Sequence, residues 1–118
     1  MTREFIMTPE FDKNWEAMGL TDDDLKNLQE EILLNPQVGK VIPGTSGLRK
    51  MRFAIRDGKR SGARVLYVDL VLAEEVYLIT AYAKGDKEDI SEADKASIRK
   101  LLDQLKRSAK ERRNTSGN

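Results

Sequence analysis

Apolar residues recur at helical spacing in two stretches near the start of the chain, and the first begins at Thr8-Pro9. Phe11, Trp15 and Met18 follow one another at i, i+4 and i+7, which places them on one face of a helix. Thr8 can cap this helix, and Pro9 suits its first position because no N–H is needed there. We therefore predict a helix and place Trp15 in the core, in preference to a base-stacking surface.

The second stretch opens at Thr21, where Asp24 three residues later makes an approximate capping box. Leu25, Leu28 and Ile32 form its buried stripe. The three consecutive aspartates of its first turn suit the helix dipole. A metal site is the less favoured interpretation, because consecutive helical side chains point in different directions. Together the two helices predict an acidic αα-hairpin with an apolar inner face.

Four further apolar runs have the length and composition of β-strands. They span residues 3–7, 47–55, 63–72 and 76–83. The third is almost continuously apolar, which is typical of a central strand, whereas the first is short and fits an edge. Short connections join the last three runs, so we predict an antiparallel meander. The Gly- and Pro-rich segment 35–47 is predicted to be a loop. We interpret its small-residue run as a turn in preference to a phosphate cradle.

A last helix is predicted from Ser91, which Asp94 supports as a cap partner. Its apolar stripe consists of Ile98, Leu101, Leu102 and Leu105. We expect residues 1–113 to form a single domain and residues 114–118 to be a frayed tail. The order β-α-α-β-β-β-α predicts an α+β fold, with the helices on one face of a mostly antiparallel sheet.

Composition narrows the chemistry that the chain can perform. It has 118 residues, the size of one domain with a modest core, and it contains neither cysteine nor histidine. Ser-His-Asp and Cys-His sites are therefore excluded, and any catalysis must use Lys, Arg, Tyr or carboxylates. We expect no metal and no cofactor. No signal peptide is evident, and no apolar stretch approaches the ~20 residues of a membrane span, so we expect a cytoplasmic protein.

Charge is distributed unevenly although the formal net charge is only +1. Residues 1–31 hold nine acids and three bases, whereas residues 47–67 hold seven bases and one acid. Those seven bases are Arg49, Lys50, Arg52, Arg56, Lys59, Arg60 and Arg64. A solvated face is the ordinary explanation of any one of them. The cluster as a whole stores like-charge repulsion that a polyanion would relieve.

Strand alternation sorts these bases into faces. Lys50 and Arg52 share one face of their strand, Arg49 belongs to the other, and Arg64 lies on the neighbouring strand. RNA can be cleaved without histidine when its own 2′-hydroxyl attacks the adjacent phosphate. Arginines then stabilise charge, and a lysine crowded by other cations can act as the base. Tyr82 could stack a base or pass a proton, or it is simply a half-buried strand aromatic.

Three segments of the chain resemble a known family. GTSGLRKMR, GKRSGARVLY and YLITAYAKGDKEDIS, in this order within about residues 35–91, are similar to the HigB-type branch of the RelE/ParE toxin superfamily. The resemblance implies a RelE-like fold and a toxin that cuts mRNA, usually in the ribosomal A site. It also implies a cognate antitoxin as partner, besides the 70S ribosome and mRNA.

The resemblance carries site roles onto matching positions. Lys50 and Arg52 match the paired bases of RelE-like sites, and Arg64 matches the arginine that contacts the scissile phosphate. Lys84 falls in the basic turn where RelE-type toxins place an arginine. The C-terminal catalytic tyrosine of RelE has no counterpart, so either Tyr82 substitutes for it or Lys50 is the sole base. Residues expected to grip ribosomal RNA are Arg49, Arg56, Lys59, Arg60 and Lys87.

Two other functions remain open at this point. A ParE-like toxin that binds DNA gyrase would share the fold without needing Lys50, Arg52 and Arg64 to converge. A non-toxic nucleic-acid-binding or protein-binding module is the other possibility. Transcript cleavage separates the first interpretation from both alternatives.

Overall fold

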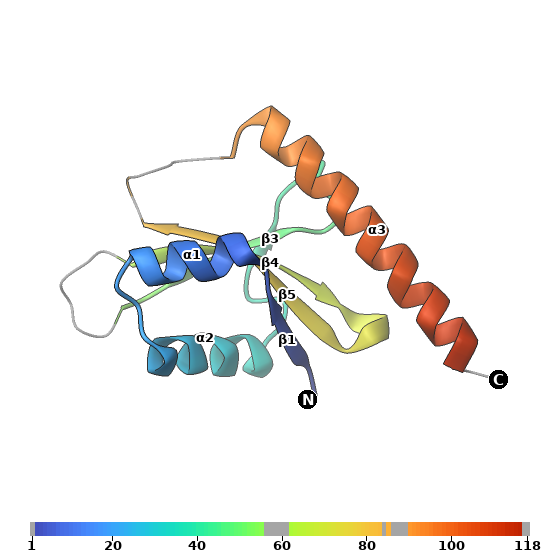
Figure 1. Cartoon of the computed structure of the whole chain (residues 1–118), viewed down its shortest axis with the longest axis horizontal. Coiled ribbons are helices and arrows are strands. Elements are labelled where there is room, and N and C mark those ends of the chain that lie inside the picture. The colour runs from blue at the N-terminus through green and yellow to red at the C-terminus, as the bar shows by residue number, and fades with distance from the viewer. Residues whose placement is uncertain (1, 56–61, 84, 86–89, 117–118) are drawn as a thin grey trace.

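The computed structural model describes residues 2–55, 62–83, 85 and 90–116, with side chains up to residue 112. Its elements are β1 (Glu4–Met7), α1 (Pro9–Ala17), α2 (Asp22–Leu34), β2 (Lys40–Val41), β3 (Arg49–Phe53), β4 (Ala63–Leu70), the 3-10 turn η1 (Val71–Ala73), β5 (Glu75–Ala83) and α3 (Glu92–Ser116). Figure 1 shows the α1–α2 hairpin on one side of the sheet and the long α3 on the other.

The described strands form one sheet in the order β1-β5-β4-β3-β2. The β3-β4-β5 meander is antiparallel as predicted, and β1 lies at an edge, parallel to β5. The sequence did not predict β2, which lies inside the expected loop and pairs with β3. Two residues are too few to show strand periodicity, so this pairing depends on contacts with β3 rather than on local pattern.

Caps and aromatic packing form the α1–α2 hairpin as predicted. The Thr8 hydroxyl accepts from the Phe11 N–H at 3.0 Å, and Thr21 and Asp24 make a reciprocal capping box. Trp15 is 5% exposed and stacks on Phe11 with ring centroids 5.2 Å apart. Its indole N–H donates to the Thr21 carbonyl at 3.2 Å, which ties the two helices together. The assignment of Trp15 to the core is therefore confirmed.

The sheet is covered on both faces, with the hairpin on one and α3 on the other. We had expected the helices on one face, so that part of the prediction is wrong. Val65 and Tyr67 of β4 pack with the hairpin, whereas Leu66 and Val68 pack with Leu102 of α3. The continuous apolar run of β4 explains this arrangement, because a strand buried on both faces has no polar side. The α+β class and the hairpin on one face are confirmed.

The long helix α3 is attached to the sheet at both halves. Leu102 is fully buried and Ala109 is 3% exposed, whereas Leu101 of the predicted stripe is 36% exposed. Arg112 donates to both carboxylate oxygens of Glu75, at 3.0 and 3.3 Å. The helix continues to Ser116, so its backbone includes the first part of the segment 114–118 that the sequence predicted to be a tail. Within the described residues, no helix is long and apolar enough to cross a bilayer.

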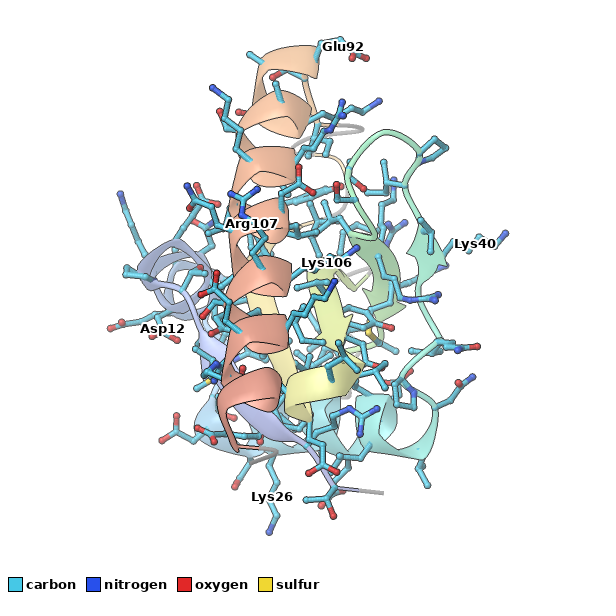
Figure 2. The ribbon with its side chains drawn as sticks, turned by 90° about the vertical axis from the view of Figure 1, so that its right-hand side faces the viewer. Asp12, Lys26, Lys40, Glu92, Lys106 and Arg107 are labelled. Carbon is cyan, nitrogen blue, oxygen red and sulfur yellow. The ribbon has the colours of Figure 1, made fainter. Side chains whose placement is uncertain are left out.

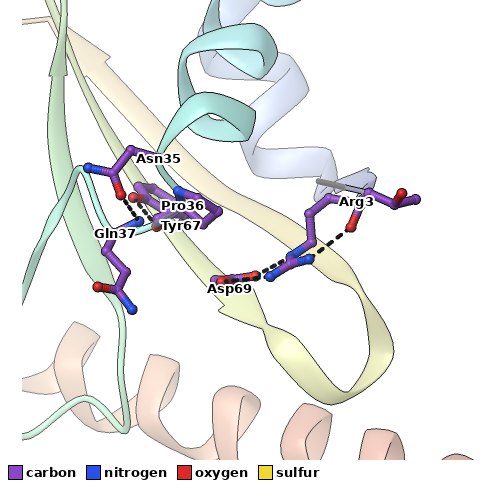
Figure 3. Close-up of polar contacts among 7 residues, drawn as sticks. Arg3, Asn35, Pro36, Gln37, Tyr67 and Asp69 are labelled. Carbon is purple, nitrogen blue, oxygen red and sulfur yellow. Dashed lines mark hydrogen bonds and ion pairs between the residues drawn. The ribbon is translucent and has the colours of Figure 1, made fainter.

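Two polar contacts fix the hairpin side of the sheet (Figure 3). The buried Tyr67 hydroxyl donates to the Pro36 carbonyl at 2.8 Å. It also accepts from the Gly39 N–H at 2.9 Å. Arg3, just before β1, donates to Asp69 of β4 at 2.7 Å, and both side chains are about nine-tenths buried. The first contact anchors the loop after α2, and the second anchors the edge strand.

Replacing Tyr67 by Phe should destabilise the protein by about 1–3 kcal/mol, because two buried backbone groups lose their partner. Urea unfolding followed by circular dichroism measures the change. Tyr77→Phe is the matched control, since Tyr77 is only half-buried on β5, and should change stability by less than about 0.5 kcal/mol. Equal effects of the two substitutions would contradict the anchoring role.

The same hydroxyl predicts an alkaline limit to this stabilisation. Burial raises the pKa of Tyr67 above its ordinary value of 10.0, because the interior disfavours the phenolate. A raised folded-state pKa means that the contribution is complete below about pH 10 and is lost as the pH rises through the folded pKa. The stability difference between wild type and Tyr67→Phe should therefore shrink above pH 10 in parallel urea titrations. A constant difference would be the contrary result.

Candidate active site

Three side chains of the candidate site lie in one row across the sheet. Arg52 of β3 is the register partner of Arg64 on β4, and Arg64 is the partner of Tyr82 on β5. Neighbouring strands are about 4.8 Å apart, so the row spans roughly 10 Å between the outer backbones. Lys50 lies on the same face, about 7 Å along β3 from Arg52, because two residues separate them.

The row lies on the α3 side of the sheet, at the end away from η1. Met51 and Phe53 point into the core beneath the hairpin, so the alternate residues Lys50 and Arg52 point to the other face. The C-terminal half of α3 packs near η1, where the β4–β5 hairpin turns (Figure 1). Arg52 and Arg64 lie on this same face, at the opposite end of the strands from that contact.

Arg64 is held at the centre of the row in an unusual state. Its Nη1 atom is buried and has no hydrogen-bond partner among the described residues. A buried donor without a partner costs about 1–3 kcal/mol, and Arg52 directly opposite adds like-charge repulsion. An anionic oxygen would satisfy the guanidinium and reduce the repulsion. A phosphate fits this requirement because Arg presents a planar fork of donors.

Gly62 allows β3 and β4 to begin their pairing close together. It precedes β4 and has a φ of +105°, a conformation that other residues rarely adopt. A Cβ atom at this position would lie 2.9 Å from the Phe53 carbonyl oxygen and 3.7 Å from Arg52 Nε. The glycine therefore protects the alignment of Arg52 with Arg64.

Tyr82 closes the row on β5. Its side chain is half-buried and packs against the core on the α3 side, so the prediction of a half-buried strand aromatic holds. The residue also borders a cavity of about 300 Å³ between α1, β5 and α3. A cavity beside the cationic row gives the site a second compartment.

Arg49 is separate from this group, as strand alternation predicted. Its guanidinium donates to the Gly39 carbonyl at 2.7 Å and reaches the Gln37 carbonyl at 3.5 Å. This places it at the loop after α2. The other predicted bases lie outside the described residues: Arg56, Lys59, Arg60, Lys84 and Lys87.

The small-residue run 44–47 forms a turn and uses its polar groups internally. Thr45 is fully buried, donates to the Ile42 carbonyl at 2.5 Å and accepts from the Leu48 N–H. Ser46 donates to Asp103 of α3 at 2.6 Å. Lys106 reaches the Ser46 carbonyl from α3, and Figure 2 shows it in the second half of the helix. The turn therefore serves to dock the loop on α3.

Sequence reasoning missed the residues that link α1 to the end of β5. Asn14 donates from Nδ2 to the Thr80 hydroxyl at 3.1 Å, although 66 residues separate them in the chain. Neither residue belongs to a motif, so only the tertiary fold brings them together. No group of three or more Asp or Glu side chains that could hold a metal ion is found in the described part of the chain.

Comparison with known proteins agrees with this architecture. No protein-family model matches the chain. A solved structure of the Escherichia coli toxin RelE, a double arginine-to-alanine mutant in the free state, is similar with a TM-score of 0.55 and 17% identity. The match covers 86% of this chain and 97% of the RelE chain. The protein has a RelE-like fold. At this identity the similarity establishes the fold, and the RelE-like site must be argued from the residues themselves.

The row predicts measurable binding to single-stranded RNA. The logarithm of the binding constant should fall linearly with the logarithm of the salt concentration. The slope should be about −0.7 for each phosphate that the protein neutralises. Arg64→Ala should weaken binding of a fluorescent oligoribonucleotide and lower that slope by about 0.7. Arg107→Ala, on the exposed second half of α3 (Figure 2), is the matched control and should leave both unchanged. An unchanged slope for Arg64→Ala would remove Arg64 from the phosphate contacts.

Proposed function

We propose that this protein is the toxin of a type II toxin-antitoxin system and that it cleaves mRNA within the ribosome. The observation that carries the proposal is a buried guanidinium nitrogen of Arg64 that no other described residue bonds, on a residue aligned between Arg52 and Tyr82. The RelE-like fold supports it, because the similar RelE structure is that of a toxin. The three sequence segments that resemble the HigB-type branch support the finer assignment.

The reaction assigned to the row needs no cofactor. The 2′-oxygen of one nucleotide bonds to its own 3′-phosphorus while the bond from phosphorus to the 5′-oxygen of the next nucleotide breaks. The products are a 2′,3′-cyclic phosphate and a new 5′-hydroxyl. Arg64 and Arg52 stabilise the phosphate charge in this scheme, because their donors are held in place before the reaction.

Proton transfer in this scheme has two candidate bases. Lys50 or Tyr82 accepts the proton of the 2′-hydroxyl. The departing 5′-oxygen receives a proton in turn, so no net proton is gained or lost. Lys84 is assigned to charge stabilisation through its match to the RelE-type turn. Arg49, Arg56, Lys59, Arg60 and Lys87 are assigned to ribosomal RNA backbone. The remaining partners in this proposal are the 70S ribosome, mRNA and a cognate antitoxin, and the location is the cytoplasm.

Transcript mapping after induction tests the cleavage activity. Wild-type protein should stop growth and create new 5′ ends inside coding regions. Arg64→Ala should lose at least about 100-fold in cleavage, since removing one such charge-stabilising donor costs 10²–10³ in rate. Its circular dichroism spectrum and melting temperature should stay close to wild type, because the change lies at a strand end.

Arg107→Ala is the control, since it removes an equal charge outside the row. Growth arrest without internal transcript ends would reject mRNA cleavage. If DNA damage accompanied that arrest, the gyrase-binding alternative would replace mRNA cleavage as the proposed function. Harmless expression of the folded wild-type protein would instead favour a non-toxic binding module.

A further inference from the structure

The cavity beside Tyr82 differs in chemistry from the cationic row that it adjoins. It has a volume of about 300 Å³, at the lower end of the range for small-molecule sites. Glu10 and Asn14 come from α1, Asp94 and Ser97 from α3, and Thr80 from β5. Two carboxylates and no Lys or Arg are among its described lining residues. This lining disfavours a phosphate and favours a neutral ligand that donates hydrogen bonds.

Asn14 is the best-positioned polar group of this cavity. Its Nδ2 donates to the hydroxyl of Thr80. Thr80 is 8% exposed and follows the bulge of β5. This bond fixes the amide orientation. The Oδ1 atom of the same amide is a hydrogen-bond acceptor at the wall of the cavity. Glu10, one helical turn before Asn14, adds a second acceptor on the same side of α1.

The remaining walls are apolar or aromatic. Ile90 is 6% exposed, and Ile98 packs beside it in the core on the α3 side. Tyr82 adds an aromatic ring. Planar heterocycles stack on aromatic rings while their edges bond to polar groups, and this combination is how proteins hold single-stranded bases. The same Tyr82 is the register partner of Arg64. One nucleotide could therefore place its phosphate at Arg64 and its base in the cavity.

We propose that the cavity is a nucleobase pocket that selects adenine, cytosine or guanine against uracil, for a nucleotide adjoining the cleaved bond. This inference rests on the proposed function and extends it to substrate selection. Adenine and cytosine each present an exocyclic amino donor, and guanine presents an amino group and a ring N–H. Uracil presents one N–H between two carbonyl oxygens, which the carboxylate of Glu10 repels.

Titration of the full-length protein with free nucleosides tests the pocket without requiring cleavage. Cytidine, adenosine or guanosine should shift the NMR signals of the Asn14 side-chain amide and of the Ser97 and Ile98 backbone. Uridine should bind at least about tenfold more weakly, because a mismatched donor-acceptor pair loses about that much. Absence of shifts with all four nucleosides, or equal affinity for uridine, would overturn the inference.

Two substitutions separate selection from folding. Glu10→Gln should reduce the discrimination against uridine several-fold, because an amide can donate as well as accept. Glu16 is exposed on the same helix, and Glu16→Gln should leave the discrimination unchanged. Ser97→Phe should fill the cavity and abolish nucleoside shifts, whereas Ser108→Phe, also exposed on α3, should leave them intact. Neither Glu10→Gln nor Ser97→Phe changes a residue of the cationic row. Normal nucleoside binding by Ser97→Phe would contradict the assignment.

Mapped transcript ends provide the second readout. If the wild type cleaves, uracil should be under-represented at one nucleotide next to the cut, and Glu10→Gln should raise its share. Cleavage with no base bias, or a bias unchanged by Glu10→Gln, would overturn the pocket while the nuclease function stands. If no cleavage occurs, the proposed function fails, and the nucleoside titration alone decides whether the pocket exists.

Discussion

Burial of β4 on both faces is the constraint on which the rest of the structure depends. Val65 and Tyr67 face the hairpin core, while Leu66 and Val68 face α3. A slip of one residue would exchange the two sets, so the register against β3 and β5 is strongly specified. The register against β5 shifts by one residue between Leu66 and Tyr67, because Ile79 of β5 is an extra residue in the pairing, whereas β4 alternates regularly between the two cores.

The candidate site inherits its geometry from this register. Arg52 opposite Arg64 is an unfavourable cross-strand pair taken alone. It persists because the pairing is fixed by buried residues further along the same strands, which outweigh a local repulsion at the strand end. An anion bound at this strand end would reduce the repulsion between the two guanidinium groups.

Tyr82 lies between two compartments of opposite character. On the β4 side it adjoins the cationic row, and on the other side it borders a cavity lined by carboxylates and an amide. Arginine suits phosphate, whereas acceptor groups suit the amino edges of bases. The acidic α1 thus supplies Glu10 and Asn14 to the second compartment. This arrangement places acidic residues of the N-terminal segment close to the cationic row.

The sequence by itself determined the helices, the meander and the face shared by Lys50 and Arg52, because capping, spacing and alternation are local properties of the backbone. It also placed Trp15 in the core. Only the tertiary structure decided that α3 covers the opposite face, that Arg64 has a buried nitrogen with no partner in the described part of the chain, and that Asn14 meets Thr80. These features depend on contacts between residues far apart in the chain, and no local pattern encodes such contacts.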